Sequence, residues 1–372
     1  MPSILLSLST SPITLVVLPL VLSVGYVLYQ CFFSPLANVP GPLLAKLTRF
    51  WLVHKTLKGN LHRELVHLHS LYGSLVRIAP DEISVAEPTA FKKIYGAGNN
   101  FRKSDWYGAL QGHRRFDLFA ERNENIHSAN RRLVSRIYSL DTIKCYEPYV
   151  DDSIRHFVGK MVEFSSTSID MGKWLQLFAF DVIGEVTFAQ RFGFMDAHEE
   201  DGIFTRINRS VASGVWLAHV PWVLRVHNFL MPAIGNWLAI NDRDGTVRDY
   251  TTREVKNRLG RGSNRPDILG RVYGAGSDTT AISLRAILYF LLIHPDKKMK
   301  LIAELDAAAA TGKLSDPVKF DEARGLPYLQ AVMYEGMRLY PAIATTLPRV
   351  VPPEGLYIDN GTKREIFAPG GV

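Results

Sequence analysis

The sequence predicts a mainly α-helical protein with small β-sheets, preceded by a helix that spans a membrane. Segments with helical spacing of apolar residues fill its middle, short alternating segments flank them, and an uncharged apolar stretch opens the chain. With 372 residues and 47% hydrophobic content, the chain can bury a large core. We therefore expect an anchor at residues 1–33, a proline-rich hinge at residues 34–45 and one large domain at residues 46–372.

Charge and cysteine content exclude several classes of function. The net charge is +7, which suits an acidic partner or an anionic membrane surface. There is no concentrated Lys/Arg tract and no nucleic-acid motif, so we expect no nucleic-acid partner. The two cysteines, Cys31 and Cys145, are too few for a disulfide framework or a zinc site. The simplest interpretation is that the domain lies in a reducing compartment.

The opening stretch is predicted to anchor the chain in a membrane. Residues 1–45 contain no Asp, Glu, Lys, Arg or His, and Ile13 to Phe33 is long and apolar enough to cross a bilayer. Tyr26 and Tyr29 lie near its end, as interfacial aromatic residues do. The first basic residues follow it, which places the domain in the cytosol. A cleaved signal peptide is the alternative, but it would begin with basic residues and have a shorter apolar region.

The next part of the chain alternates helices, a hairpin and a basic helical face. Pro40-Gly41-Pro42 cannot continue the anchor helix, so we expect a stiff elbow before helices over residues 43–71. Residues 75–78 and 82–85 alternate around a Pro-Asp turn and predict a hairpin, after which Pro88 begins a short helix. In the helix expected at residues 125–133, His127 and Arg131 share one face. They could hold an anionic group, although a solvated basic face is the alternative.

Residues 151–192 predict two helices separated by a run of Ser and Thr at residues 165–168. The second carries Asp181 and Glu185 four residues apart, which we interpret as polar groups of the helix face rather than a catalytic pair. Trp216, Trp222 and Trp237 follow in an apolar region punctuated by prolines. Core packing is the simplest interpretation of these rings; a hydrophobic pocket and contact with the membrane are the alternatives.

The central feature is Gly274-Ala275-Gly276-Ser277-Asp278-Thr279-Thr280, which opens an apolar stretch extending to Ile293. On a helix, Gly276, Asp278 and Thr279 would place a gap, a proton donor and a hydroxyl within one turn. Such polar side chains compete with backbone hydrogen bonds, so their cluster inside a helix requires an explanation. The alternative is that Ser277 or Asp278 caps a helix that begins there.

Two further helices and short strands complete the chain. A His294-Pro295 pair ends the central helix, another helix is expected at residues 296–310, and one more from Leu326 to Tyr340. On the last, Glu335 and Arg338 share a face among apolar neighbours, so we expect a buried ion pair. Residues 347–351 and 356–358 have the pattern of strands separated by Pro and Gly turns.

Taken in order, these motifs resemble those of the cytochrome P450 family, and most closely its membrane-anchored fungal members. The matching features are the elbow and four segments: Pro40-Gly41-Pro42, His127-Ser128-Ala129-Asn130-Arg131-Arg132, Ala275-Gly276-Ser277-Asp278-Thr279-Thr280, Glu335-Gly336-Met337-Arg338 and Arg349. Each motif alone is weak, but five in the family's order behind an anchor are specific.

The resemblance implies a haem-thiolate monooxygenase that carries haem b. It implies that Arg131, His127 and Arg349 hold the haem propionates, that Ala275 and Gly276 leave room for O2, and that Asp278 and Thr279 handle protons and oxygen. Glu335 and Arg338 would form a structural pair. Electrons would come from an NADPH-dependent flavoprotein reductase, and the substrate would be a lipophilic small molecule of secondary metabolism. The expected location is the endoplasmic reticulum membrane, with the domain facing the cytosol.

The chain departs from the family pattern in two places. The iron-ligating Cys belongs to a Phe-x-x-Gly-x-Arg-x-Cys-x-Gly loop expected beyond the strands after Arg349, and the sequence ends at Val372 before such a loop. The oxygen-binding helix also lacks several apolar turns before Val272. We therefore expect an incomplete cytochrome P450 domain. A catalytically inactive, membrane-tethered fragment or pseudo-enzyme without haem is the alternative.

Overall fold

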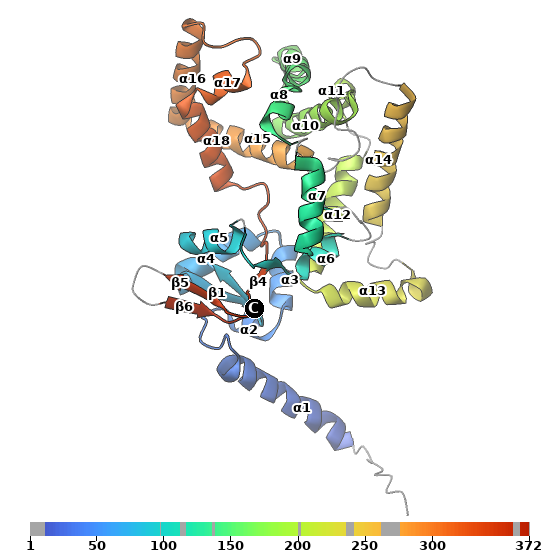
Figure 1. The fold of residues 1–372 in the computed structure, drawn as a ribbon, viewed down its shortest axis with the longest axis vertical. Coiled ribbons are helices and arrows are strands. Elements are labelled where there is room, and N and C mark those ends of the chain that lie inside the picture. Colours follow the sequence, from blue (N-terminus) through green and yellow to red (C-terminus); the bar gives the residue numbers. More distant parts are fainter. Residues whose placement is uncertain are drawn as a thin grey trace, which may run out of the picture.

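A computed structural model of the chain describes residues 12–96, 98–111, 117–135, 138–199, 202–235, 242–261, 276–359 and 365–371. Its first element is helix α1 (Pro12–Leu28), which continues into the π-helical turn η1 (Tyr29–Phe33). Figure 1 shows α1 projecting away from the rest of the molecule. The span from Leu15 to Phe33 has a mean hydropathy of 2.0 and is 6% buried, so it is long and apolar enough to cross a membrane. An exposed apolar helix of this kind was expected from the sequence.

The end of the molecule next to α1 combines short helices with small sheets (Figure 1). Its helices are α2 (Leu43–Leu47), α3 (Phe50–Leu57), α4 (Leu61–Tyr72) and α5 (Pro88–Tyr95). Within the described residues, the strands form three antiparallel pairs: β1 (Leu75–Ala79) with β2 (Glu82–Val85), β3 (Arg102–Lys103) with β4 (Arg349–Val350), and β5 (Leu356–Asp359) with β6 (Glu365–Ala368). The β1–β2 hairpin was expected from the sequence; its register places Leu75 opposite Val85, with an irregularity between Arg77 and Ala79. One apolar cluster joins both ends of the sequence and contains Leu36, Val39, Leu75, Ala90, Val351, Leu356 and Ala368.

The rest of the molecule is helical, as the sequence predicted. In chain order its elements are α6 (Trp106–Gln111), α7 (Glu124–Ser135), α8 (Leu140–Lys144), α9 (Glu147–Glu163), α10 (Met171–Phe188), α11 (Phe194–Ala197), α12 (Ile203–Ala218), α13 (Pro221–Ile234), α14 (Asp242–Arg261), α15 (Gly276–Ile293), α16 (Pro295–Ala310), α17 (Phe320–Arg324) and α18 (Pro327–Leu339). Helix α10 packs along α15, and its other side contributes to a core of large side chains: Trp174, Leu177, Phe180, Phe194, Met195, Ile203 and Phe204.

Asp181 has a structural role in this core. Its buried carboxylate accepts hydrogen bonds from the backbone N–H groups of Gly193, Phe194 and Met195, at 2.9, 3.2 and 3.0 Å. Three donors at the turn before α11 are thereby satisfied inside the protein, where an unpaired N–H would be costly. The side chain that the sequence marked as a polar group of the helix face therefore fixes the turn that follows α10.

The elbow after the anchor is held by Arg77, whose side chain is fully buried. Its guanidinium donates to the carbonyl oxygens of Gln30 and Pro80, at 2.9 and 2.6 Å, and to the hydroxyl of Ser34 at 3.2 Å. A Cβ atom at Gly41 would collide with the Arg77 backbone, so only glycine fits where the elbow crosses β1. Because Gln30 belongs to η1, these contacts tie the end of the anchor to the first sheet.

Candidate functional site

A cluster of basic side chains forms where β3 pairs with β4. The pairing places Lys103 opposite Arg349. The Arg349 guanidinium donates to the phenol oxygen of Tyr107 and lies 5.1 and 5.2 Å from the ring centres of Tyr95 and Tyr107. The Lys103 ammonium donates to the carbonyl oxygens of Leu118 and Glu121, at 3.1 and 3.0 Å. Two half-buried cations are therefore fixed side by side, with aromatic rings around them.

Helix α7 brings two more basic groups to the same place. Burial, and then the positive charge of Lys103, lower the pKa of His127; Arg131 acts in the same direction, and Glu124 opposes them. Burial, followed by the charge of Arg349, lowers the pKa of Lys103. Lys103 thus lies near enough to repel both Arg349 and His127, and Arg131 repels His127; Lys103, His127, Arg131 and Arg349 are here called the basic cluster. An anion placed among them would remove that repulsion and form charge-assisted hydrogen bonds.

The structure links the pair that the sequence placed on one helix face, His127 and Arg131, to Arg349 through Lys103. It adds Lys103 and Tyr107, which sequence reasoning did not assign. The available signal was the mixture of basic and aromatic residues from Phe101 to Tyr107, but nothing in a linear pattern shows that this stretch pairs with the strand at Arg349. That strand pairing is a long-range contact, and it decides the composition of the cluster.

Asp278 lies at a different place, in the first turn of α15 against α10. Gln176 donates its side-chain N–H to Asp278 Oδ1 at 3.4 Å, and Arg285 donates to Gln176 Oε1 and to the Gly172 carbonyl, both at 2.7 Å. Burial raises the pKa of Asp278, while the Gln176 hydrogen bond and the Arg285 charge oppose that rise. The carboxyl is therefore held in a half-buried setting that favours its protonated form.

The other predicted residues of this motif have different outcomes. Gly276 begins α15, so Ser277 and Asp278 lie inside the helix rather than before it. The backbone carbonyl of Thr279 accepts a hydrogen bond from the Ser283 hydroxyl at 2.9 Å. Ala275 lies outside the described residues. Within the described residues, α15 packs mainly against α10, whereas the basic cluster is built from β3, β4 and α7.

The expected burial of the pair on α18 is wrong. Arg338 donates two hydrogen bonds to Glu335, at 2.6 and 2.7 Å, but the two side chains are 67% and 54% exposed. The reason lies in the packing of α18, which turns buried Gly336 toward Ile287 of α15. With about 100° between successive residues, Arg338 points to the side opposite Gly336. The motif forms an ion pair, but in solvent.

Comparisons with known proteins define the class. The family model of cytochrome P450 matches residues 39–258 and 267–361. The chain is 42% identical over 385 residues to the cytochrome P450 monooxygenase hepC of Aspergillus oryzae, covering 94% of this chain and 75% of that relative. It is 34% identical over 399 residues to a cytochrome P450 monooxygenase of Aspergillus terreus, covering 97% and 80%. It is 31% identical over 395 residues to a pisatin demethylase of Fusarium vanettenii, covering 94% and 72%.

The chain belongs to the cytochrome P450 family, whose members are monooxygenases. The family implies haem, O2, a lipophilic substrate and a redox partner that supplies electrons. The mainly helical fold with small sheets agrees with that assignment.

The basic cluster fits the carboxylate end of a haem. Its four basic side chains come from β3, β4 and α7, and an anion bound there would offset the desolvation that lowers the pKa values of Lys103 and His127. The cysteines lie elsewhere: Cys31 is part of η1 beside Arg77, and Cys145 is exposed directly after α8. Neither cysteine belongs to the basic cluster.

Proposed function

We propose that this chain is a haem-thiolate monooxygenase that oxidises a lipophilic small molecule in fungal secondary metabolism. The observation that carries the proposal is the basic cluster, because its cations converge from separate elements and match the two carboxylates of the family's cofactor. Sequence relatives of the same family, all named as monooxygenases or a demethylase, support the same reaction class. When bound, the haem supplies the activation of O2 that the reaction requires.

In this proposal the protein's own side chains position the cofactor and handle protons. Arg349 and Lys103, from the β3–β4 pairing, and His127 and Arg131, from α7, would hold the two propionates. Tyr107 keeps the Arg349 guanidinium in place through its phenol oxygen. Orientation by strands and a helix is more rigid than orientation by loops alone would be.

Asp278 is the proposed proton carrier. Its Oδ1 accepts the hydrogen bond from Gln176, which leaves Oδ2 as the atom that would take up a proton. A raised pKa keeps a carboxyl protonated at higher pH, which suits a group that gives up a proton and regains it. Arg285 fixes the Gln176 amide and thereby the direction of the carboxyl. Thr279, one residue further on, would supply a hydroxyl beside this carboxyl where O2 is used.

The proposed location is the endoplasmic reticulum membrane, with the domain on the cytosolic face. The exposed apolar helix supports an anchor, and the basic residues that follow it support the orientation. The net positive charge suits docking of an NADPH-dependent flavoprotein reductase through an acidic surface.

The test compares haemin with its dimethyl ester, which lacks the two carboxylates. The full chain is titrated with each compound, and binding is followed by the Soret absorbance. We expect the ester to bind about tenfold more weakly or worse, because each lost charge-assisted contact is worth about 1.5–3 kcal/mol. Arg349→Ala should weaken haemin binding but leave ester binding nearly unchanged. Arg155→Ala, which removes an exposed cation on α9, is the matched control. Equal affinity for the two compounds would refute the assignment of the cluster.

A second candidate, a membrane-tethered protein without monooxygenase activity, rests on the positions of the two cysteines outside the basic cluster. The carbon monoxide difference spectrum separates the candidates. On the first proposal the expressed enzyme gives the band characteristic of a thiolate-bound haem. On the second, no such band appears, because that candidate carries no haem.

A further inference from the structure

We propose that the cavity between the membrane anchor and the domain binds the choline headgroup of a phosphatidylcholine molecule. The cavity has a volume of about 590 Å³, within the range of small-molecule sites. Side chains from opposite sides of the junction line it, chiefly Tyr26, Tyr29, Arg49, Phe50, Asp81 and Trp222. The inference rests on the proposed membrane insertion of α1.

The position of the cavity relative to the membrane follows from the anchor. Tyr26 and Tyr29 belong to the last turns of the apolar span that ends at Phe33. Tyrosine rings at the end of a span lie at the level of the lipid headgroups, where one face is apolar and the hydroxyl is wet. The hydroxyl of Tyr26 donates to the Leu47 carbonyl at 2.9 Å, which fastens the end of the anchor to α2. The cavity beside these rings therefore opens where lipid headgroups are the most abundant ligand.

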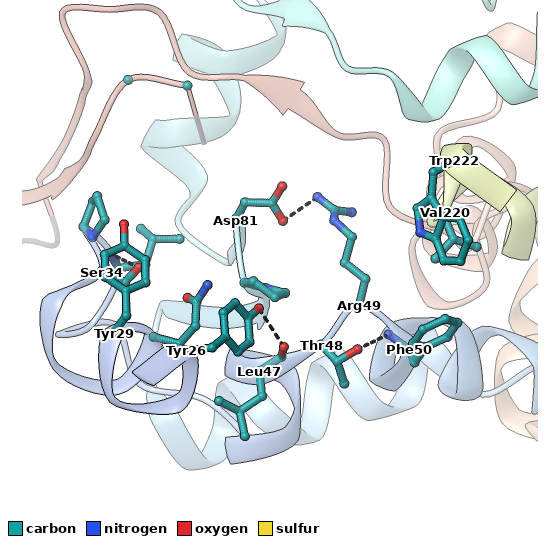
Figure 2. A pocket seen from close by; sticks show the side chains of 16 residues that line it. Tyr26, Tyr29, Ser34, Leu47, Thr48, Arg49, Phe50, Asp81, Val220 and Trp222 are labelled. Atoms are coloured by element: carbon teal, nitrogen blue, oxygen red, sulfur yellow. Dashed lines mark hydrogen bonds and ion pairs between the residues drawn. The ribbon is translucent and has the colours of Figure 1, made fainter. Parts of the chain in front are cut away.

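The walls suit a cation with apolar substituents. In Figure 2 the two tyrosines lie on one side of the cavity and Phe50 and Trp222 on the other, with the Arg49–Asp81 pair between them. Phe50 and Trp222 form an edge-to-face pair with ring centres 6.4 Å apart. All four rings are about half exposed, so their faces are accessible. Aromatic faces and a carboxylate are the groups that recognise quaternary ammonium ions.

The charges at the cavity also favour a cation. Arg49 lies 2.7 Å from Asp81 and 3.1 Å from Glu82, so one guanidinium faces two carboxylates. The Glu82 side chain is mostly buried, whereas Asp81 is 62% exposed and directed to the cavity. We place the trimethylammonium group against Asp81 and the tyrosine rings. The lipid phosphate accepts from N–H groups of Arg49 that the two recorded ion pairs do not use, because a guanidinium has five donors.

The identity of the lipid follows from hydration. The ammonium of phosphatidylethanolamine is a small, strongly hydrated cation. Trimethylammonium is larger and more weakly hydrated, so it loses less hydration free energy when it contacts aromatic rings. Phosphatidylglycerol carries a negative charge without a cation, so it would approach two carboxylates for one arginine. A zwitterionic choline lipid matches the aromatic walls, the exposed carboxylate and the guanidinium together.

The experiment uses the full chain in mixed micelles with equal amounts of phosphatidylcholine, phosphatidylethanolamine and phosphatidylglycerol. Retained lipid is counted by native mass spectrometry. We expect one tightly held phosphatidylcholine, preferred about tenfold over the other two, since a cation–π and charge gain near 1.4 kcal/mol gives that ratio. Asp81→Asn and Trp222→Leu should each reduce the preference at least threefold.

The control variant is Asp152→Asn. Asp152 is exposed to a similar extent, 68%, and also lies 2.7 Å from an arginine, but it belongs to α9, away from the anchor. It should retain the wild-type preference. Equal retention of the three lipids by the wild type, or an unchanged preference in both cavity variants, would overturn the proposal. Circular dichroism melts identify a variant that fails to fold. In that case Trp222→Phe, which keeps an aromatic ring, is measured instead and should preserve the preference for phosphatidylcholine. Loss of the preference in Trp222→Phe would also count against the site.

Flotation with phosphatidylcholine vesicles separates this inference from the anchor on which it rests. If the chain does not float, the membrane anchor is refuted. If it floats but shows no lipid preference in micelles, the anchor stands and the headgroup site is refuted.

Discussion

Arg349 of β4 donates a hydrogen bond to the phenol oxygen of Tyr107 of α6, and its guanidinium also lies over the Tyr107 and Tyr95 rings. Residues far apart in the sequence thereby fix one cation of the basic cluster. Burial raises the pKa of Tyr107, while the Arg349 hydrogen bond and charge oppose this rise. The phenol consequently remains a neutral acceptor that orients Arg349 without cancelling its charge.

Replacing this phenol should loosen the cation without removing it. We expect Tyr107→Phe to reduce haemin affinity about five- to tenfold, because the lost hydrogen bond to a charged group is worth roughly 1.5 kcal/mol. Affinity for the dimethyl ester should be unchanged. The Soret titration measures both, and Tyr138→Phe, on the surface beyond α7, is the control. A uniform loss of affinity for haemin and ester would point to general damage of the fold.

The hydroxyl after Asp278 should determine how efficiently O2 is used. In the haem-loaded monooxygenase, we expect Thr279→Ala to raise peroxide release relative to product, because the hydroxyl no longer steadies bound oxygen beside the proton carrier. Oxygen consumption, peroxide and product are measured together. Thr280→Ala changes an exposed neighbour and should leave the ratio as it is. If Thr279→Ala leaves the ratio of peroxide to product unchanged, the polar residues of this motif serve only to start the helix.

His219 should make the fold sensitive to acid. Its side chain is fully buried, and burial lowers its pKa to about 4 from 6.5. The folded state therefore binds fewer protons than the unfolded state between these values, so stability falls as the pH drops from about 6.5 to about 4. A lowering of the pKa of this size corresponds to a loss of stability of about 3 kcal/mol on acidification.

Urea unfolding at pH 7 and pH 4.5 measures this effect. We expect His219→Phe to be less destabilised than the wild type on acidification, by about 2–3 kcal/mol. The exposed His67→Gln should behave like the wild type. If His219→Phe shows the wild-type loss between the two pH values, another group causes the acid sensitivity.

The contact between α18 and α15 should tolerate no side chain at Gly336. A Cβ atom there would lie 2.6 Å from Cγ1 and 3.3 Å from Cα of Ile287. We expect Gly336→Ala to destabilise the protein by about 1–3 kcal/mol despite the higher helix propensity of alanine, because overpacking exceeds that gain. Glu335→Gln, next to it on the exposed face, should change the melting temperature little. A stabilised Gly336→Ala variant would contradict the close approach of the two helices.

Local patterns in the sequence were sufficient for most elements. The apolar span to Phe33, the hairpin around Pro80, the separation of α9 from α10 and the end of α15 at His294 depend on residue spacing and on proline and turn chemistry, which act over a few residues. The family assignment also followed from the order of motifs, which the family match supports.

The tertiary structure decided which side chains meet and which are buried. Apolar neighbours of Glu335 predicted a buried pair, but the contact of Gly336 with Ile287 turned that pair to solvent. Lys103 entered the basic cluster only because β3 pairs with β4, and Asp181 became a cap because the chain after α10 folds back onto its carboxylate. Periodicity fixes the faces of an element, whereas contacts between distant elements depend on how those faces pack, and one sequence in isolation does not carry that information.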